Sequence, residues 1–175
     1  GSLAKDGCIY YFPCDDYANN ILKLNPSNGD SLSLVGEEID EEFYATVLGK
    51  DGFIYGISYS RIIRFNPVDH SVICIGSEFD EAHLWTEAVL AGDDKIYAAN
   101  EYGQILCIDT CQNDWRIIGN RIYKRTIHGW GYPVLGADKC IYFSPLCHDR
   151  VLRYNPTTQS ISLIGESYGE KEWKW

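Results

Sequence analysis

The sequence predicts an all-β protein, a β-propeller made of four blade repeats with four antiparallel strands each. Three features recur once per repeat: an Ile-Tyr dipeptide, a later Asn or Asp, and a closing glycine. They stand at Ile9-Tyr10, Ile54-Tyr55, Ile96-Tyr97 and Ile141-Tyr142, at Asn25, Asn66, Asp109 and Asn155, and at Gly36, Gly76, Gly119 and Gly165. The Ile-Tyr spacings are therefore 45, 42 and 45 residues. A period of this length, with several short strands per unit, is typical of propeller blades.

Each repeat divides into four segments rich in β-branched and aromatic residues, as a half-buried pleated surface favours. In the third repeat we expect strands at 85–90, 95–98, 104–108 and 115–118, and the first of these is matched by 43–48 and 130–135. An Asp-Gly-type turn joins the first two strands, because glycine adopts positive φ at little steric cost. Asn-Pro ends the third strand, since proline has no N–H for the ladder. No stretch shows helical periodicity.

The invariant turns and the variable loops are expected on opposite sides of the blades. The variable loops are 13–20, 58–61, 100–103 and 145–150 within the repeats, and 37–42, 77–84, 120–129 and 166–172 between them. Divergent loops on a constant scaffold indicate a binding face. The alternative is that these loops drift because nothing constrains them.

Two kinds of side chain make the variable loops candidates for binding. The contact candidates are the loop tyrosines Tyr17, Tyr59, Tyr102 and Tyr168 and the basic residues Arg121, Lys124, Arg125 and His128. The corresponding earlier loops are acidic, with Glu37, Glu38, Asp40, Glu41 and Glu42 followed by Glu78, Asp80 and Glu81. We therefore expect an acidic sector and a basic sector on this side, the alternative being an ordinary solvated polar face.

The innermost strands supply candidate channel residues, namely Trp85, Glu87, Trp130 and Tyr132. Aromatic rings at a channel mouth can stack on a sugar or clamp a peptide side chain. Equivalent positions in every blade are also what packing between blades needs, and packing is the favoured interpretation for the tryptophans.

Composition restricts the possible partners. The formal net charge of −10 argues against nucleic-acid binding, which needs clustered Lys and Arg. No apolar run approaches the roughly 20 residues that span a membrane, so no membrane partner is expected. The seven cysteines are odd in number and irregularly placed. This pattern favours reduced thiols and an intracellular, cytoplasmic location.

The reactive side chains form no convincing catalytic or metal-binding motif, so we expect no catalytic residue, metal or other cofactor. Cys107 and Cys111 lack the second pair that a zinc site favours. Cys147-His148-Asp149 is interpreted as a polar loop tip, because catalytic triads are assembled from distant segments.

Residues 1–175 are expected to form one propeller domain or a propeller fragment, with repeats at about 4–48, 49–90, 91–135 and 136–175. The segment 173–175 matches the start of an innermost strand, and Leu3 matches the end of one. The two halves could close a four-bladed disc, which is the slightly favoured outcome. Alternatively, open strand edges could recruit a second copy to complete a larger ring.

The motifs Asp51-Gly52-Phe53-Ile54-Tyr55, Ile63-Arg64-Phe65-Asn66-Pro67 and Ile75-Gly76 resemble the propeller repeats of many algal and protist proteins. They are similar, more distantly, to blades of gluconolactonase and NHL-type propellers. The resemblance implies a propeller and little about ligands. Gluconolactonase-type enzymes have six blades and a channel metal held by acidic and amide side chains, whereas here the inner strands 43–48, 85–90 and 130–135 offer Glu87 as their acid.

These observations lead to a functional expectation of a non-enzymatic binding or assembly module. Its partner would be an unidentified protein that contacts the variable-loop face, with self-association as a further possibility. Two alternatives stay open: a propeller hydrolase or lactonase in which Glu87 ligates a channel metal, and a lectin-like module that binds sugar through its aromatic residues.

Overall fold

The computed structural model describes residues 1–15, 18–123 and 129–169, and in these it contains sixteen strands and no helix. The first sheet consists of β1 (Ser2–Leu3), β2 (Ile9–Tyr11), β3 (Ile21–Asn25) and β4 (Ser31–Val35), and the second of β5 (Phe43–Leu48), β6 (Ile54–Ser58), β7 (Ile62–Phe65) and β8 (Val72–Ile75). The third consists of β9 (Ala88–Leu90), β10 (Ile96–Ala99), β11 (Ile105–Asp109) and β12 (Asp114–Ile118), and the fourth of β13 (Trp130–Leu135), β14 (Ile141–Pro145), β15 (Val151–Asn155) and β16 (Ser160–Ile164).

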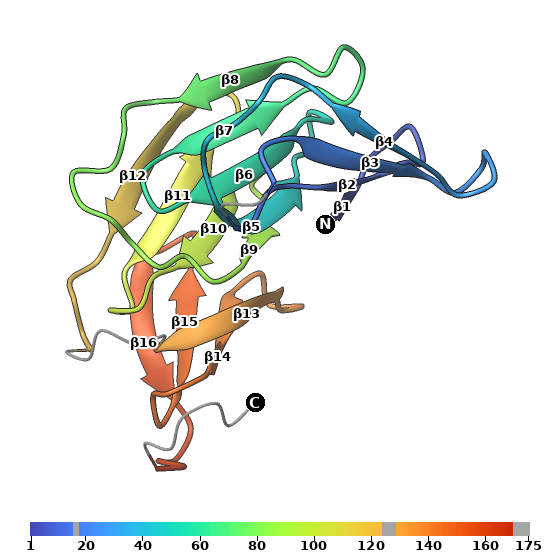
Figure 1. The fold of residues 1–175 in the computed structure, drawn as a ribbon. Helices are drawn as coiled ribbons and strands as arrows, with labels where there is room; N and C mark the ends of the chain where they lie inside the picture. The colour runs from blue at the N-terminus through green and yellow to red at the C-terminus, as the bar shows by residue number, and fades with distance from the viewer. Residues whose placement is uncertain (16–17, 124–128, 170–175) are drawn as a thin grey trace. The chain divides into compact units, whose positions relative to one another are not determined.

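Each sheet is an antiparallel meander in which neighbouring strands pair in chain order (Figure 1). The all-β prediction of four sheets with four strands each is therefore confirmed. The expected inner strands 43–48 and 130–135 are observed with those bounds. The expected strand 85–90 is shorter, because β9 begins at Ala88. Just ahead of the expected strand, the Leu84 N–H donates to the Glu101 side chain at 3.0 Å, which holds the chain to the loop 100–103 there.

The turn between the first and second strands of each sheet has the backbone conformation that the sequence predicts. Gly7 and Gly52 have φ angles of 79° and 92°, and the matching Asp94 and Lys139 both have φ 65°. Positive φ suits glycine and is tolerated by Asp, but it strains Lys. The turn geometry is thus retained even where glycine is absent.

The chain divides into two compact units, residues 1–82 and 83–175, with two sheets in each. In the first unit, the core lies between the first and second sheets and contains Tyr10, Phe12, Phe43, Ile54 and Phe65. Phe12 meets Phe43 and Phe65 edge-on, with ring centroids 5.4 and 5.8 Å apart. Burial of such aromatic side chains dominates the packing energy of small cores.

The second unit repeats this arrangement between the third and fourth sheets. Its core contains Tyr97, Cys107, Trp130, Phe143 and Tyr154, all at most 2% exposed. All seven cysteines of the chain are free, and Cys8, Cys107, Cys140 and Cys147 are buried. Among the described residues, no helix is long and apolar enough to cross a membrane.

Candidate binding surface on the variable-loop side

The most regular residues of the repeat stabilise the first turn of each sheet. In all four sheets, one carboxylate oxygen of the turn Asp accepts the N–H two residues later, and the other accepts the hydroxyl of the motif Tyr. The Tyr–Asp pairs are Tyr10–Asp6, Tyr55–Asp51, Tyr97–Asp93 and Tyr142–Asp138, at 2.7–2.8 Å. Burial, followed by this hydrogen bond, raises the pKa of Tyr55 and Tyr97 well above the ordinary value. The motif is therefore structural, and residues that differ between repeats are better candidates for binding.

Several buried polar residues of the variable loops cap turns between the second and third strands. The Ser58 hydroxyl oxygen accepts the N–H groups of Ser60 and Arg61 at 3.2 and 3.0 Å. Asn100 Oδ1 accepts the N–H groups of Tyr102 and Gln104 at 3.1 and 2.9 Å. A capping role explains why these polar groups are buried, since unsatisfied buried N–H groups are costly.

His148 has the same capping role in the fourth sheet. Its Nδ1 accepts the N–H of Arg150 at 3.1 Å, and its ring stacks on Trp130 with centroids 4.3 Å apart. The side chain is buried, as is Cys147. The stretch Cys147-His148-Asp149 is thus a packed, turn-stabilising segment rather than an exposed loop tip.

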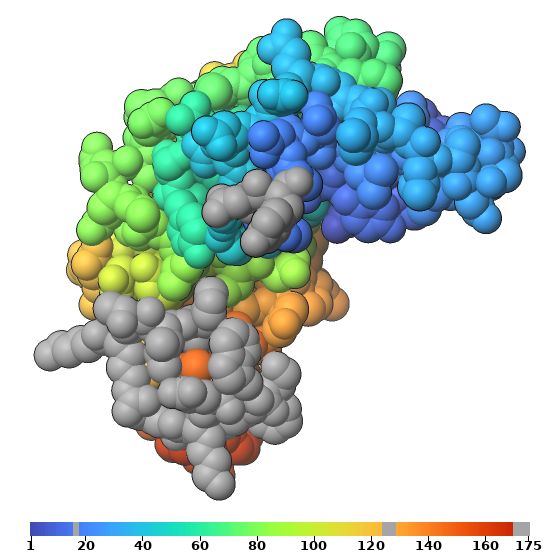
Figure 2. Space-filling model, viewed as in Figure 1, coloured from blue at the N-terminus to red at the C-terminus, as the bar shows by residue number. Residues whose placement is uncertain are grey.

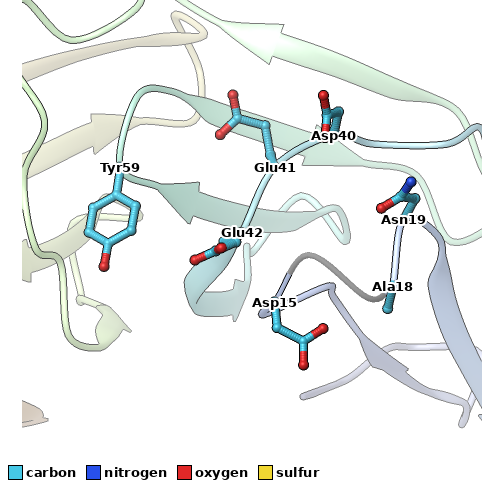
Figure 3. A pocket seen from close by; sticks show the side chains of 7 residues that line it. All are labelled: Asp15, Ala18, Asn19, Asp40, Glu41, Glu42 and Tyr59. Carbon is cyan, nitrogen blue, oxygen red and sulfur yellow. The ribbon is translucent and has the colours of Figure 1, made fainter.

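A hollow of about 260 Å³ lies on the variable-loop side of the first unit. It is lined by Asp15, Ala18, Asn19, Asp40, Glu41, Glu42 and Tyr59. Figure 3 shows these side chains arranged around the hollow, with Tyr59 on one side and Ala18 and Asn19 on the other. Four of the seven lining residues carry a carboxylate and none is a cation, so the hollow attracts positive charge.

One aromatic residue, Tyr59, lines this acidic hollow, and a second aromatic ring packs against it. Tyr59 packs on Tyr44 with ring centroids 4.2 Å apart, and the Tyr44 hydroxyl donates to Glu42. Tyr44 is the extra residue of a β-bulge, because the pairing shifts register between Phe43 and Ala45. A bulge re-aims the side chain that it carries, which here places the Tyr44 ring against the variable loop.

Arg61 forms ion pairs with both acidic loops, the one that precedes the second sheet in the chain and the one that follows it. Its Nε lies 2.8 Å from Glu41 Oε1, and one terminal nitrogen lies 2.9 Å from Glu78 Oε1. The Ser60 hydroxyl also donates to Glu41 at 2.8 Å. Arg61 therefore partly neutralises Glu41. Asp15, Asp40 and Glu42 are the other carboxylates that line the hollow. Arg61 was not among the binding residues predicted from the sequence. It could have been found as the single cation of the loop 58–61, which lies between two acidic loops in the chain.

In the second unit, the structure brings two predicted contact residues together. The Arg121 guanidinium lies over the ring of Tyr102, 4.2 Å from its centroid, which is cation–π geometry. Tyr168 is 58% exposed, and its N–H donates to the carbonyl of Asp149 at 3.0 Å. The other predicted contacts, Tyr17, Lys124, Arg125 and His128, lie outside the described residues.

The four channel candidates fall into two groups. Trp85 and Trp130 are at most 1% exposed, and Trp130 Nε1 donates to the carbonyl of Arg150 at 2.8 Å. Glu87 and Tyr132 are exposed, Tyr132 at 56% and with a φ of 45° at a bulge in β13. Desolvation raises the pKa of Glu87 above its ordinary value.

In the part of the chain that the structure describes, no group of three or more His, Cys, Asp or Glu side chains is placed to hold a metal ion.

No protein-family model and no curated protein matches the sequence. Solved structures do match. A catalytically inactive virginiamycin B lyase from Staphylococcus aureus, solved with quinupristin, has a TM-score of 0.73 and 15% identity over 94% of this chain and 54% of its own. Hydrazine synthase from Kuenenia stuttgartiensis has a TM-score of 0.66 and 14% identity over 94% and 48%. An auxiliary nutrient binding protein from Bacteroides ovatus has a TM-score of 0.64 and 12% identity over 92% and 45%.

These likenesses support a β-propeller fold, and at such low identity they carry no activity over to this chain. The chain spans about half the length of these structures. They do not distinguish the algal and protist repeat type, or the NHL type, from other propeller repeats.

Proposed function

We propose that this protein is a non-enzymatic binding module, and that the acidic hollow of its first unit receives a Lys or Arg side chain from a protein partner. The observation that carries this proposal is the convergence of Asp15, Asp40 and Glu42 on one hollow of about 260 Å³. They come from two separate loops, and Tyr59 reaches the hollow from a third. All three loops are among the segments that vary between the repeats.

The chemistry of the hollow fits a basic side chain better than a neutral one. An ammonium or guanidinium group offers several N–H donors, which several carboxylates can accept at once. The Tyr59 ring that lines the hollow can pack against the aliphatic stem of Lys or Arg. The net charge of −10 would also increase the association rate of a basic partner at low salt.

The proposal is tested with fluorescent peptides that carry either Lys and Arg or Asp and Glu at the same positions, titrated with purified protein. The basic peptide should bind and the acidic peptide should not. Binding should weaken as salt rises, because exposed charges are screened beyond about 10 Å at 0.1 M ionic strength.

Two matched double variants locate the binding site. Asp15→Asn with Asp40→Asn removes two charges from the hollow, and Glu37→Gln with Glu38→Gln removes two from the same acidic region outside its lining. Each exposed charge pair contributes about 0.2–1 kcal/mol, so the first variant should weaken binding by about 2- to 30-fold. An equal effect of both variants would show that net charge, and not the hollow, attracts the peptide.

A further inference from the structure

In both units, an equivalent apolar row on one sheet is covered by the other sheet of that unit. In the second sheet, Leu48, Ile54, Phe65 and Val72 lie side by side across the four strands. Ile54 and Phe65 are 0% exposed, and this row packs on the first sheet. In the fourth sheet, the matching row is Leu135, Ile141, Tyr154 and Ile161. Ile141 and Tyr154 belong to the core shared with the third sheet.

The first sheet has the same apolar row, and there its two end residues are exposed and its two middle residues are half-buried. The row consists of Leu3, Ile9, Leu24 and Leu32, paired across β1 to β4. Leu3 is 61% exposed and Leu32 is 64% exposed, and beside the row Leu34 is 68% exposed and Tyr11 is 42% exposed. We call this surface the open face of the first sheet. The blue region of β3 and β4 is at the surface in the space-filling view (Figure 2).

This open face is not an ordinary solvent-facing side of a sheet. Solvent-facing strand positions are usually polar, and a contiguous apolar patch on a soluble protein marks an interaction site. The repeat also identifies what normally covers such a row. The row of the second sheet is covered by the Tyr10 side of the first sheet, and the row of the fourth sheet by the Tyr97 side of the third.

The fourth sheet presents a matching but incompletely buried Tyr side, which we call the open face of the fourth sheet. It carries Val134, Tyr142, Val151 and Arg153, which correspond in register to Ser2, Tyr10, Ile21 and Lys23 of the first sheet. Val134 is 63% exposed, and the other three are half-buried. By contrast, Ser2, Tyr10 and Ile21 are all buried.

We propose that the open face of the first sheet docks the open face of the fourth sheet of a second copy of this chain. Each of the two observed contacts between sheets contains an aromatic pair. The ring centroids of Tyr10 and Phe65 are 5.2 Å apart, and so are those of Tyr97 and Tyr154. In the new contact, Tyr142 of one copy packs on Leu24 of the other. Two copies docked head to tail satisfy both open faces.

This inference goes beyond the proposed function, because it concerns a different surface and a different partner. Sedimentation of the purified chain over a range of concentrations should show a mass of about twice 19.9 kDa. Leu32→Glu with Leu34→Glu should reduce the mass to 19.9 kDa, because a charge is costly in an apolar interface. Val68→Glu is the matched control: Val68 is 89% exposed in the Asn-Pro turn of the second sheet, and this variant should remain a dimer.

A mixing experiment tests the head-to-tail direction. Val134→Glu with Val151→Glu disables the open face of the fourth sheet, and this variant should also be a monomer by itself. Mixed with the Leu32→Glu, Leu34→Glu variant, it should form a heterodimer, because one intact pair of faces remains. All substituted side chains are exposed or half-buried, and circular dichroism verifies that each variant is folded. A wild-type chain that stays monomeric, a dimer that survives both double variants, or a mixture that fails to associate would overturn the proposal.

Discussion

Tyr97 of the third sheet and Tyr142 of the fourth occupy the same place in the repeat, yet their surroundings differ. Each donates its hydroxyl to the Asp four residues earlier, at 2.7 and 2.8 Å. Tyr97 is 2% exposed and packs on Tyr154, whereas Tyr142 is half-buried beneath Arg153, whose guanidinium lies 6.0 Å from its ring. The local motif therefore forms identically in both sheets, and the next sheet decides how much the motif contributes to stability.

The largest expected difference between a covered and an uncovered sheet face concerns Phe65 and Leu24, which occupy equivalent positions. Phe65→Ala should lower the free energy of unfolding by about 3–5 kcal/mol, because it opens a cavity between two sheets. Leu24→Ala should cost much less, since Leu24 is only half-buried. Urea unfolding should be measured at concentrations low enough for single chains. Equal losses would show that the open face of the first sheet is already covered within one chain.

A smaller difference is expected when the tyrosine hydroxyl is removed. Tyr97→Phe removes a part-buried hydrogen bond to the charged Asp93 and should cost about 1–3 kcal/mol. Tyr142→Phe should cost less, because the Tyr142–Asp138 hydrogen bond is exposed to solvent and water competes with it. Thermal unfolding of the two variants provides the comparison. If they melt at the same temperature, burial by the neighbouring sheet adds nothing to this hydrogen bond.

The turn carboxylates should make stability depend on acidity. Hydrogen bonds from Tyr142 and from the Cys140 N–H hold the pKa of Asp138 below its ordinary value of 3.8. For Asp6, burial acts in the opposite direction, but the bonds from Cys8 and Tyr10 outweigh it and the pKa is also lowered. A lowered folded-state pKa contributes stability that is present above pH 3.8 and is lost as pH falls through the folded value.

The urea midpoint should therefore decrease as the pH falls below 3.8. Asp138→Asn should flatten this dependence, since the variant has one fewer carboxylate to protonate. A pH profile unchanged by Asp138→Asn would contradict the role of this turn.

The smallest predicted effect concerns Arg61 of the first unit. Arg61→Gln leaves Glu41 and Glu78 without their cation and makes the acidic hollow more negative. A basic peptide should bind up to about fivefold more tightly, because one exposed ion pair contributes at most about 1 kcal/mol. Arg121→Gln in the second unit is the matched control, and it should leave this affinity unchanged. Weaker binding to the Arg61 variant would show that Arg61 holds the loops in place for binding.

The sequence by itself determined the repeat, the strand order and the turns, because these depend on residues close together in the chain. Asp6 and Tyr10, or Asn66 and Val68, meet within one hairpin, and short-range hydrogen bonds need no tertiary context. The sequence also indicated that the 37–42 and 77–84 loops are acidic, which agrees with the lining of the hollow in the first of them.

Only the tertiary structure decided which identical-looking positions are buried and which loop residues meet. The burial of Tyr10 and the exposure of Leu32 depend on which sheet lies against each side, and one strand's alternation cannot show this. Arg61 pairs with Glu41 across 20 residues, and Tyr59 reaches the hollow through contact with the bulged Tyr44. Such contacts depend on the packing of whole sheets, because long-range neighbours are set by tertiary packing and not by local periodicity.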